Sequence, residues 1–268
     1  MNKRVVLAGL VAPAIFLCAL ASARAGETTI GVTLNATVGT HSEDPYSSQR
    51  LPLVAAPIFT IEHTQGPFSL FLEGLPPIGP VGFSDQGPGR SVATKLSMFD
   101  GSVRYDVPGG RVWAGIGETV LDQVTYYHRS ETYVNPAYTD IFTQDQADAS
   151  RVVGARFEAG AIPWNRGGMR IDLSVAVSPR MHGRVTKTLT DTFTTTDPSL
   201  TPDSHTSSYG FFETASLVDG QARFSVTRSR STWSAGLRYV NYNAIDQYGY
   251  ETDRNRLLLP FIGWATRI

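Results

Sequence analysis

Apolar and polar residues alternate along most of this chain. Between Thr29 and Gly39 one face carries only apolar side chains, and these are Ile30, Val32, Leu34, Ala36 and Val38. Threonine, glycine and asparagine occupy the other face. A period of two residues predicts a β-strand with one apolar and one polar face. The same alternation recurs over residues 152–161, 169–178, 218–227 and 233–239, so the chain is predicted to be all-β.

Weaker alternation elsewhere brings the predicted number of strands to ten. They are expected at residues 29–40, 51–63, 67–76, 93–107, 111–128, 150–163, 168–185, 207–228, 232–244 and 254–268. The facing of residues 111–128 stays open, because the adjacent Val112 and Trp113 are both apolar. Pro57 and Pro260 lie inside predicted strands, where each removes a ladder hydrogen bond, so bulges or frayed pairing are expected there.

The connections between these strands alternate between short and long. The short ones are residues 64–66, 108–110, 164–167 and 229–231, and the long ones are residues 41–50, 77–92, 129–149, 186–206 and 245–253. Short turns at one end, long loops at the other and an even number of strands are typical of a barrel in the bacterial outer membrane. We therefore expect a ten-stranded antiparallel up-and-down transmembrane β-barrel. A soluble secreted β-sandwich is the alternative, but it has no reason to keep its short turns at one end.

The first 25 residues have the pattern of a secretory signal peptide. Lys3 and Arg4 precede an apolar stretch that runs to Leu20, and Ala23 and Ala25 occupy the −3 and −1 positions of a cleavage site. We expect a signal peptide at residues 1–25 and an outer-membrane β-barrel domain at residues 26–268. A single anchoring helix is the alternative, but the apolar stretch is short for about 30 Å of hydrocarbon and contains a proline.

Composition removes several function classes. The chain of 268 residues has a formal net charge of −1, which gives no basic face for nucleic acid. Its one cysteine, Cys18, lies in the predicted signal peptide and excludes both an intramolecular disulfide framework and a thiolate zinc site. None of the five histidines has a paired metal spacing, so neither a metal nor a cofactor is expected.

The polar faces of the predicted strands carry the charged residues that must point into the barrel. They are Glu62, Glu73, Arg104, Asp106, Arg156, Glu158, Arg170, Asp172, Arg223 and Arg238. An arginine facing lipid near the midplane would cost about 2–4 kcal/mol, whereas inside the barrel opposite charges can pair across neighbouring strands. Because side chains fill the interior of small barrels, we expect this network to plug the lumen and leave at most a narrow channel.

All four tryptophans lie near the predicted short turns or the C-terminus. They are Trp113, Trp164, Trp233 and Trp264. Indole rings favour the lipid headgroup layer, so these residues are predicted to form an aromatic girdle at the periplasmic rim. Four core tryptophans are the alternative, but a core would not favour one end of the molecule.

A secretory signal, alternating strands and a last strand that runs to the chain end resemble bacterial outer-membrane β-barrel proteins. Ile262, Trp264 and Ile268 match the apolar positions of their closing strand, although that strand usually ends on an aromatic residue. The stretches Thr29–Thr40, Glu43–Ser47 and Leu51–Leu53 also resemble the first two strands of the MipA/OmpV group. The resemblance implies a monomer in the cell outer membrane, with the barrel assembly machinery, outer-membrane lipid and lipopolysaccharide as partners.

The function is less sharply defined than the fold. Polar loops with several tyrosines favour a structural, surface-interaction or narrow-pore role, more readily than an enzyme. His128 and Ser130, with Glu131 adjacent, resemble the histidine–serine pair of outer-membrane lipid A deacylases. An omptin-like protease is a further alternative, in which His128 would act with aspartates; the candidates are Asp140, Asp145, Asp148 and Asp246. Both hydrolase readings remain alternatives at this point.

Overall fold

The computed structural model describes residues 26–268 apart from residue 37 and the segments 45–46, 52–54, 79–82 and 86–88. The described residues form strands and the turns that join them. No helix among them has the length and hydrophobicity needed to cross a membrane. The predicted signal peptide, including Ala23 and Ala25, lies outside the described residues.

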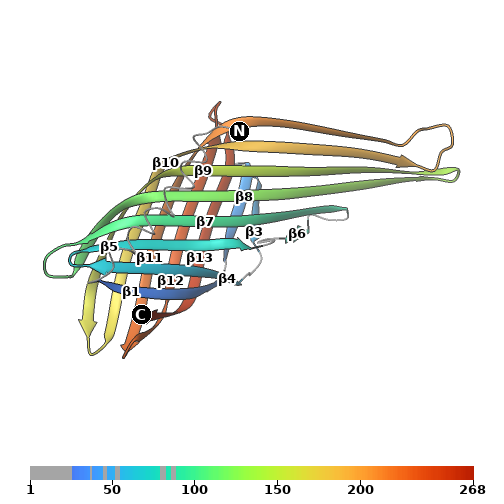
Figure 1. Cartoon of the computed structure of the whole chain (residues 1–268). Coiled ribbons are helices and arrows are strands. Elements are labelled where there is room, and N and C mark those ends of the chain that lie inside the picture. The colour runs from blue at the N-terminus through green and yellow to red at the C-terminus, as the bar shows by residue number, and fades with distance from the viewer. Residues whose placement is uncertain (1–25, 37, 45–46, 52–54, 79–82, 86–88) are drawn as a thin grey trace.

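Ten strands follow one another around a ring, each antiparallel to its neighbours (Figure 1). They are β1 (Glu27–Ala36), β4 (Ala55–Gln65), β5 (Phe68–Ile78), β7 (Arg90–Asp106), β8 (Val112–Asn135), β9 (Tyr138–Arg166), β10 (Met169–Thr195), β11 (Asp203–Arg228), β12 (Ser231–Asp246) and β13 (Glu251–Arg267). The ring closes because β1 pairs with β13 from Thr29↔Arg267 to Asn35↔Phe261. The predicted ten-stranded up-and-down barrel is thereby confirmed.

Three short strands extend the ring at the end with the longer connections. They are β2 (Val38–Asp44), β3 (Ser47–Leu51) and β6 (Phe83–Asp85). Strand β2 pairs with β13 and with β3, and β6 pairs with β7. The predicted loop at residues 41–50 is therefore, in its described part, the end of a hairpin.

Alternate side chains face opposite sides of the barrel wall, and the two sides differ in chemistry. The outward positions are apolar and exposed; among them are Leu34, Phe59, Val103, Ile116, Phe157, Leu173, Phe224, Leu237 and Ile262. The inward positions include buried charged residues, such as Asp100 and Arg238, which are 1% and 4% exposed. Glu118 departs from this pattern, because it is exposed between the outward Ile116 and Val120. Its paired neighbours, Gly101 and Ala155, are small.

Two predicted loops turned out to be paired strands. Residues 129–149 were expected to be a loop, but β8 and β9 stay paired as far as Asn135↔Tyr138. Residues 186–206 were expected to be another, but β10 and β11 stay paired as far as Phe193↔Asp203. Both segments contain several threonines and a phenylalanine, and residues 129–149 also contain two tyrosines. These residue types favour extended pairing even where neither face is apolar. Apolar alternation alone therefore underestimated the length of these strands.

The two prolines cause no bulge, but on one side of each strand the pairing ends beside them: β4 pairs with β5 only from Phe59 onward, and β13 pairs with β1 only as far as Phe261. Pro57 pairs with Leu34, and Pro260 pairs with Leu237, in each case without a shift of register. Each proline faces outward, and a missing ladder bond there is tolerated without a bulge. The register shifts instead in β10 between Ser178 and Met181, where the strand pairs with β9 and β11.

Replacement of Ile116 by arginine tests which face meets lipid. This side chain is 67% exposed on the outer wall. Ile116→Arg is expected to lower the free energy of unfolding from lipid vesicles by about 2–4 kcal/mol, because hydrocarbon does not solvate the guanidinium group. The matched control is Val134→Arg on the projecting β8–β9 hairpin, where Val134 is 78% exposed. Urea titration should give an effect within about 0.5 kcal/mol for this control. Equal effects at both positions would contradict the lipid-facing assignment.

Candidate functional site

The barrel interior holds a continuous network of ion pairs. Arg238 lies against Glu73 and Asp219, with nitrogen–oxygen distances of 2.6 Å in both pairs. Arg156 lies 3.2 Å from Asp100 and 3.4 Å from Asp219. All five side chains are largely buried, and they come from the separate strands β5, β7, β9, β11 and β12. Mutual neutralisation lets these charges lie in an interior that would otherwise penalise each of them by several kcal/mol.

A second ion pair continues the network toward the end with the short turns. Arg104 binds Glu158 with two hydrogen bonds of 2.6 and 3.1 Å, and Ser102 donates a further hydrogen bond to the same carboxylate. The Arg104 guanidinium also lies over the rings of Phe71 and Trp113, at 3.5 and 4.5 Å from their centroids. A guanidinium group that is both bidentate and stacked is held in one orientation.

The structure brings most of the predicted charged residues together, but not all of them. Asp172 accepts a 2.6 Å hydrogen bond from Arg170 and lies 3.6 Å from Arg223. Among the described residues, Glu62 and Asp106 have no ion-pair partner within 4.0 Å. Both are only half-buried, near the ends of their strands, where water can solvate a carboxylate.

Sequence reasoning missed two carboxylates at the centre of the network. Asp100 is 1% exposed and accepts a 2.6 Å hydrogen bond from Thr119, while Asp219 joins the two central arginines. Asp219 lies in a predicted strand opposite Val218, so its inward position follows from the alternation. The inward position of Asp100 follows in the same way, because it alternates in step with Ser102 and Arg104. The available signal was the period of two, extended by one step in each strand.

An apolar layer lies in the lumen beyond the charged network. It consists of Leu121, Val152, Met181, Ala215, Leu217, Tyr242 and Ala244. The inward alternation of β8 to β12 places these side chains beyond the ion pairs, toward the projecting hairpins. The cavity among the charged residues, lined by Phe71, Glu73, Arg104, Arg156 and Arg238 among others, measures only about 30 Å³.

Three carboxylates lie close enough together to be considered as a cation site. Oxygen atoms of Glu73, Asp100 and Asp219 lie within 4.8 Å of one another. Arg238, however, contacts all three carboxylates, at 2.6, 4.0 and 2.6 Å respectively. Arg156 contacts two of them. The guanidinium groups supply the positive charge that a metal ion would supply, so we assign no metal to this trio.

The predicted aromatic girdle needs one correction. Trp164, Trp233 and Trp264 are exposed on the outer face, and Trp233 pairs directly with Trp264 across β12 and β13. Trp113 instead points into the lumen: a side chain added at Gly160 would collide with its indole ring. The outward position next to it is taken by Val112. Trp113 faces inward because its ring covers the guanidinium group of Arg104.

The residues proposed for a hydrolase come only partly together. His128 Nδ1 and Asp145 Oδ1 are 2.7 Å apart on the exposed wall of the β8–β9 hairpin. No hydrogen bond between described residues joins Ser130 to His128. The other three aspartates have partners of their own: Asp140 binds Thr195, Asp148 binds Lys187, and Asp246 binds the backbone of the 246–250 turn. The nucleophile–base contact that a serine hydrolase needs is therefore not part of this geometry.

The closed ring, the apolar exterior and the paired charges inside define a class of protein. They are the features of a transmembrane β-barrel of the outer-membrane type, because only a closed sheet leaves no backbone group unpaired in hydrocarbon.

Comparison with known proteins adds no family. No protein-family model matches the chain, and no curated protein matches it. Similar solved structures include the outer membrane protease OmpT of Escherichia coli, with 9% identity, a TM-score of 0.44, and 90% of this chain and 97% of that chain covered. The toluene transporter TbuX of Ralstonia pickettii has 8% identity and a TM-score of 0.39, with 90% of each chain covered. Ail of Yersinia pestis has 10% identity and a TM-score of 0.31, with 91% of this chain and 99% of that chain covered.

Removal of one central carboxylate tests the network. Asp219→Ala leaves Asp100 as the one carboxylate among the described residues within 4.0 Å of both Arg156 and Arg238, so the free energy of unfolding should fall by about 3–5 kcal/mol. The control is Asp145→Ala, which removes a carboxylate from an exposed pair and should cost at most about 1 kcal/mol. Urea unfolding of both variants in lipid vesicles measures the difference. Similar losses in the two variants would show that the central charges are not interdependent.

Proposed function

We propose that this protein is exported with cleavage after Ala25, spans the outer membrane as a monomer, and presents a rigid polar β-sheet for recognition outside the cell. The barrel assembly machinery and outer-membrane lipid are its proposed partners during and after insertion. The resemblance of residues 29–53 to the MipA/OmpV group belongs to the same proposal. Its proline and tyrosine markers, Pro45, Tyr46 and Pro52, lie outside the described residues.

The observation that carries this proposal is the length of the four strands β8 to β11. Strand β7 stops pairing with β8 at Arg90↔Arg129, and β12 stops pairing with β11 at Glu213↔Asp246. Beyond these points β8, β9, β10 and β11 continue to pair with one another. Figure 1 shows the two hairpins projecting well past the other strands. Such a projection adds nothing to the membrane crossing and requires a role outside it.

Backbone pairing and side-chain hydrogen bonds hold the projecting sheet together. Hydroxyl groups on β10 and β11 contact each other at three successive cross-strand positions; the pairs are Thr188–Ser208, Thr190–Thr206 and Thr192–Ser204. In the β10–β11 turn, Asp197 accepts hydrogen bonds from the hydroxyl and the backbone N–H of Ser199. These bonds lower the pKa of Asp197 and keep its carboxylate charged. A sheet ordered to its tip loses little conformational entropy when it binds.

The chemistry of the projecting sheet suits contact with a hydrated macromolecule. Tyr133 and Tyr209 are 61% and 59% exposed, and tyrosine gives a large, rigid contact area with a polar end. Carboxylates outnumber cations in these segments; they are Glu131, Asp140, Asp145, Asp148, Asp191, Asp197 and Asp203, against Arg129 and Lys187. This charge balance favours neutral or amino-bearing glycans over sulfated ones.

The interior supports recognition rather than conduction. A charged layer and an apolar layer both fill the lumen, and the cavity between the charged groups holds about 30 Å³. Among the described residues, no nucleophile contacts the exposed His128–Asp145 pair through a hydrogen bond, so a serine hydrolase of the lipid A deacylase type is less well supported.

A barrel with trimmed hairpins tests the proposal. One deletion removes residues 130–143, the other removes residues 188–208, and an Asn-Gly turn closes each gap. Because these segments lie beyond the ring, the trimmed protein should still insert into vesicles and shift on heating in a gel. On an array of neutral, amino-bearing and sulfated glycans, we expect the full chain to bind a neutral or amino-bearing glycan and the trimmed barrel to bind it at least tenfold more weakly.

Two outcomes would contradict the proposal. The first is equal glycan binding by the trimmed barrel, or binding confined to sulfated glycans or absent altogether. The second is stepwise ion conductance when the full chain is placed in a planar bilayer, because the closed lumen predicts none.

A further inference from the structure

Three arginines on the outer wall of the barrel lie where the apolar belt ends. The outward residues of β10 are apolar through the first nine positions of the strand, and they are Met169, Ile171, Leu173, Val175 and Val177. About 9–11 residues of tilted strand cross the hydrocarbon. The next outward side chains, beyond the register shift, include Arg180 and Arg184, both exposed. These two residues therefore lie at the boundary between hydrocarbon and headgroups on the side of the projecting hairpins.

Two of the arginines face each other across neighbouring strands. Arg184 of β10 is the direct register partner of Arg151 of β9. Like charges in opposite positions on one face of a sheet destabilise the pairing. Asp122 partly neutralises Arg151, with 3.4 Å between Asp122 Oδ1 and Arg151 Nε. Arg180 and Arg184 have no ion-pair partner within 4.0 Å among the residues that the structure describes. The arrangement leaves unbalanced positive charge where anionic lipid headgroups lie.

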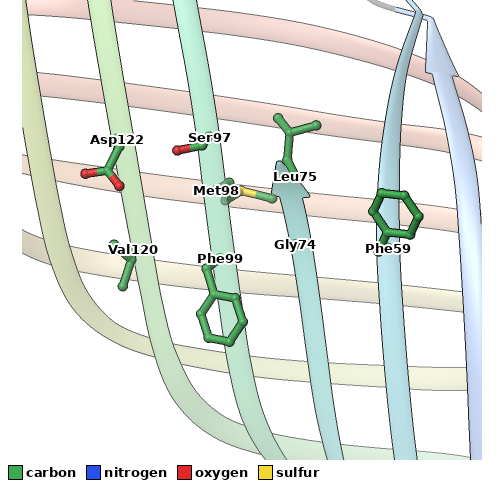
Figure 2. A pocket seen from close by; sticks show the side chains of 8 residues that line it. All are labelled: Phe59, Gly74, Leu75, Ser97, Met98, Phe99, Val120 and Asp122. Carbon is green, nitrogen blue, oxygen red and sulfur yellow. The ribbon is translucent and has the colours of Figure 1, made fainter. Parts of the chain in front are cut away.

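An apolar groove opens on the same wall, and one residue of its lining, Asp122, is the ion-pair partner of Arg151. It has a volume of about 380 Å³ and is lined by Phe59, Gly74, Leu75, Ser97, Met98, Phe99, Val120 and Asp122. Figure 2 shows Phe59 and Phe99 on either side of the β5 ribbon at Gly74, with Asp122 at the edge nearest β9. Asp122 thus belongs both to the groove and to the ion pair with Arg151. A molecule with an apolar chain and an anionic head could contact both features.

We infer that Arg151, Arg180 and Arg184 bind a phosphate group of an outer-leaflet lipid, one of whose acyl chains lies in the groove at Gly74. The inference rests on the proposed placement of the barrel in the outer membrane. The chemistry required is a phosphomonoester attached to several acyl chains, as in the lipid A part of lipopolysaccharide. Guanidinium groups suit phosphate oxygens because they donate paired hydrogen bonds and stay charged.

Native mass spectrometry of the folded full chain in detergent tests this site. The probes are lipid A with both phosphates, the same lipid after dephosphorylation, phosphatidylethanolamine and inorganic phosphate. We expect the protein to retain bisphosphorylated lipid A at least tenfold more strongly than either other lipid. Millimolar inorganic phosphate should not displace it, because free phosphate gains nothing from the groove.

Two variants separate the headgroup contact from the acyl contact. Arg180→Ala combined with Arg184→Ala removes no ion pair between described residues, so the barrel should fold, and lipid A retention should fall at least tenfold. Gly74→Leu fills the groove, where an added Cβ would meet nothing closer than 3.9 Å. It should weaken the binding of lipid A without abolishing its preference for phosphate. The control is Arg230→Ala in the short turn at the opposite end of the barrel.

The outcomes distinguish this inference from the placement of the barrel. If the full chain does not insert into vesicles or shift on heating, both the placement and the lipid site are overturned. If it inserts but binds dephosphorylated lipid A equally well, only the lipid site is overturned. The same holds if the double arginine variant binds lipid A as well as Arg230→Ala does. Displacement by inorganic phosphate alone would show an ordinary anion site instead of a lipid site.

Discussion

The structure depends first on the pairing of β1 with β13. A sheet in hydrocarbon cannot leave an edge, because each unpaired N–H or C=O group there costs several kcal/mol. The register from Thr29↔Arg267 to Asn35↔Phe261 closes the ring and removes both edges at once. Closure also separates the two faces of every strand into an outside and an inside. A slip of one residue would bring Arg238 to the lipid and Leu237 to the lumen, so the charge pattern itself fixes the register.

The interior follows from the small size of the ring. Ten strands leave room for side chains but not for a wide channel, so the inward residues must satisfy one another. The ion pairs around Arg156 and Arg238 and the layer that contains Met181 and Tyr242 fill the lumen in different ways. Because side chains fill the described part of the lumen, we propose that recognition takes place on the projecting hairpins and lipid binding on the outer wall.

The fold was largely predictable from the sequence, and the site only in part. The period of two gave the ten strands and the inward charges, since residues such as Glu158 and Asp172 stand between apolar neighbours. It failed where neighbouring residues do not differ in polarity. It did not give the facing of Trp113 beside Val112 or the length of the threonine-rich hairpins, and it did not predict the shift of register at Ser178. Pairings between strands, such as Arg238 with Glu73 or Arg184 with Arg151, join residues that are far apart in the chain. Local alternation carries no information on which strand positions lie opposite each other.

Cysteine cross-linking of the seam tests closure most directly. Leu34 and Ile262 are register partners on the outer face of β1 and β13. The single native cysteine, Cys18, lies in the predicted signal peptide, so the chain that begins at Gly26 after the proposed cleavage adds no competing thiol. We expect Leu34→Cys combined with Ile262→Cys to form an intramolecular disulfide in intact membranes, seen as a mobility shift of the unfolded, unreduced chain. The unpaired combination of Leu34→Cys with Leu258→Cys should not form one. Failure of the seam pair to cross-link in a protein that inserts and shifts on heating would contradict the closed ring.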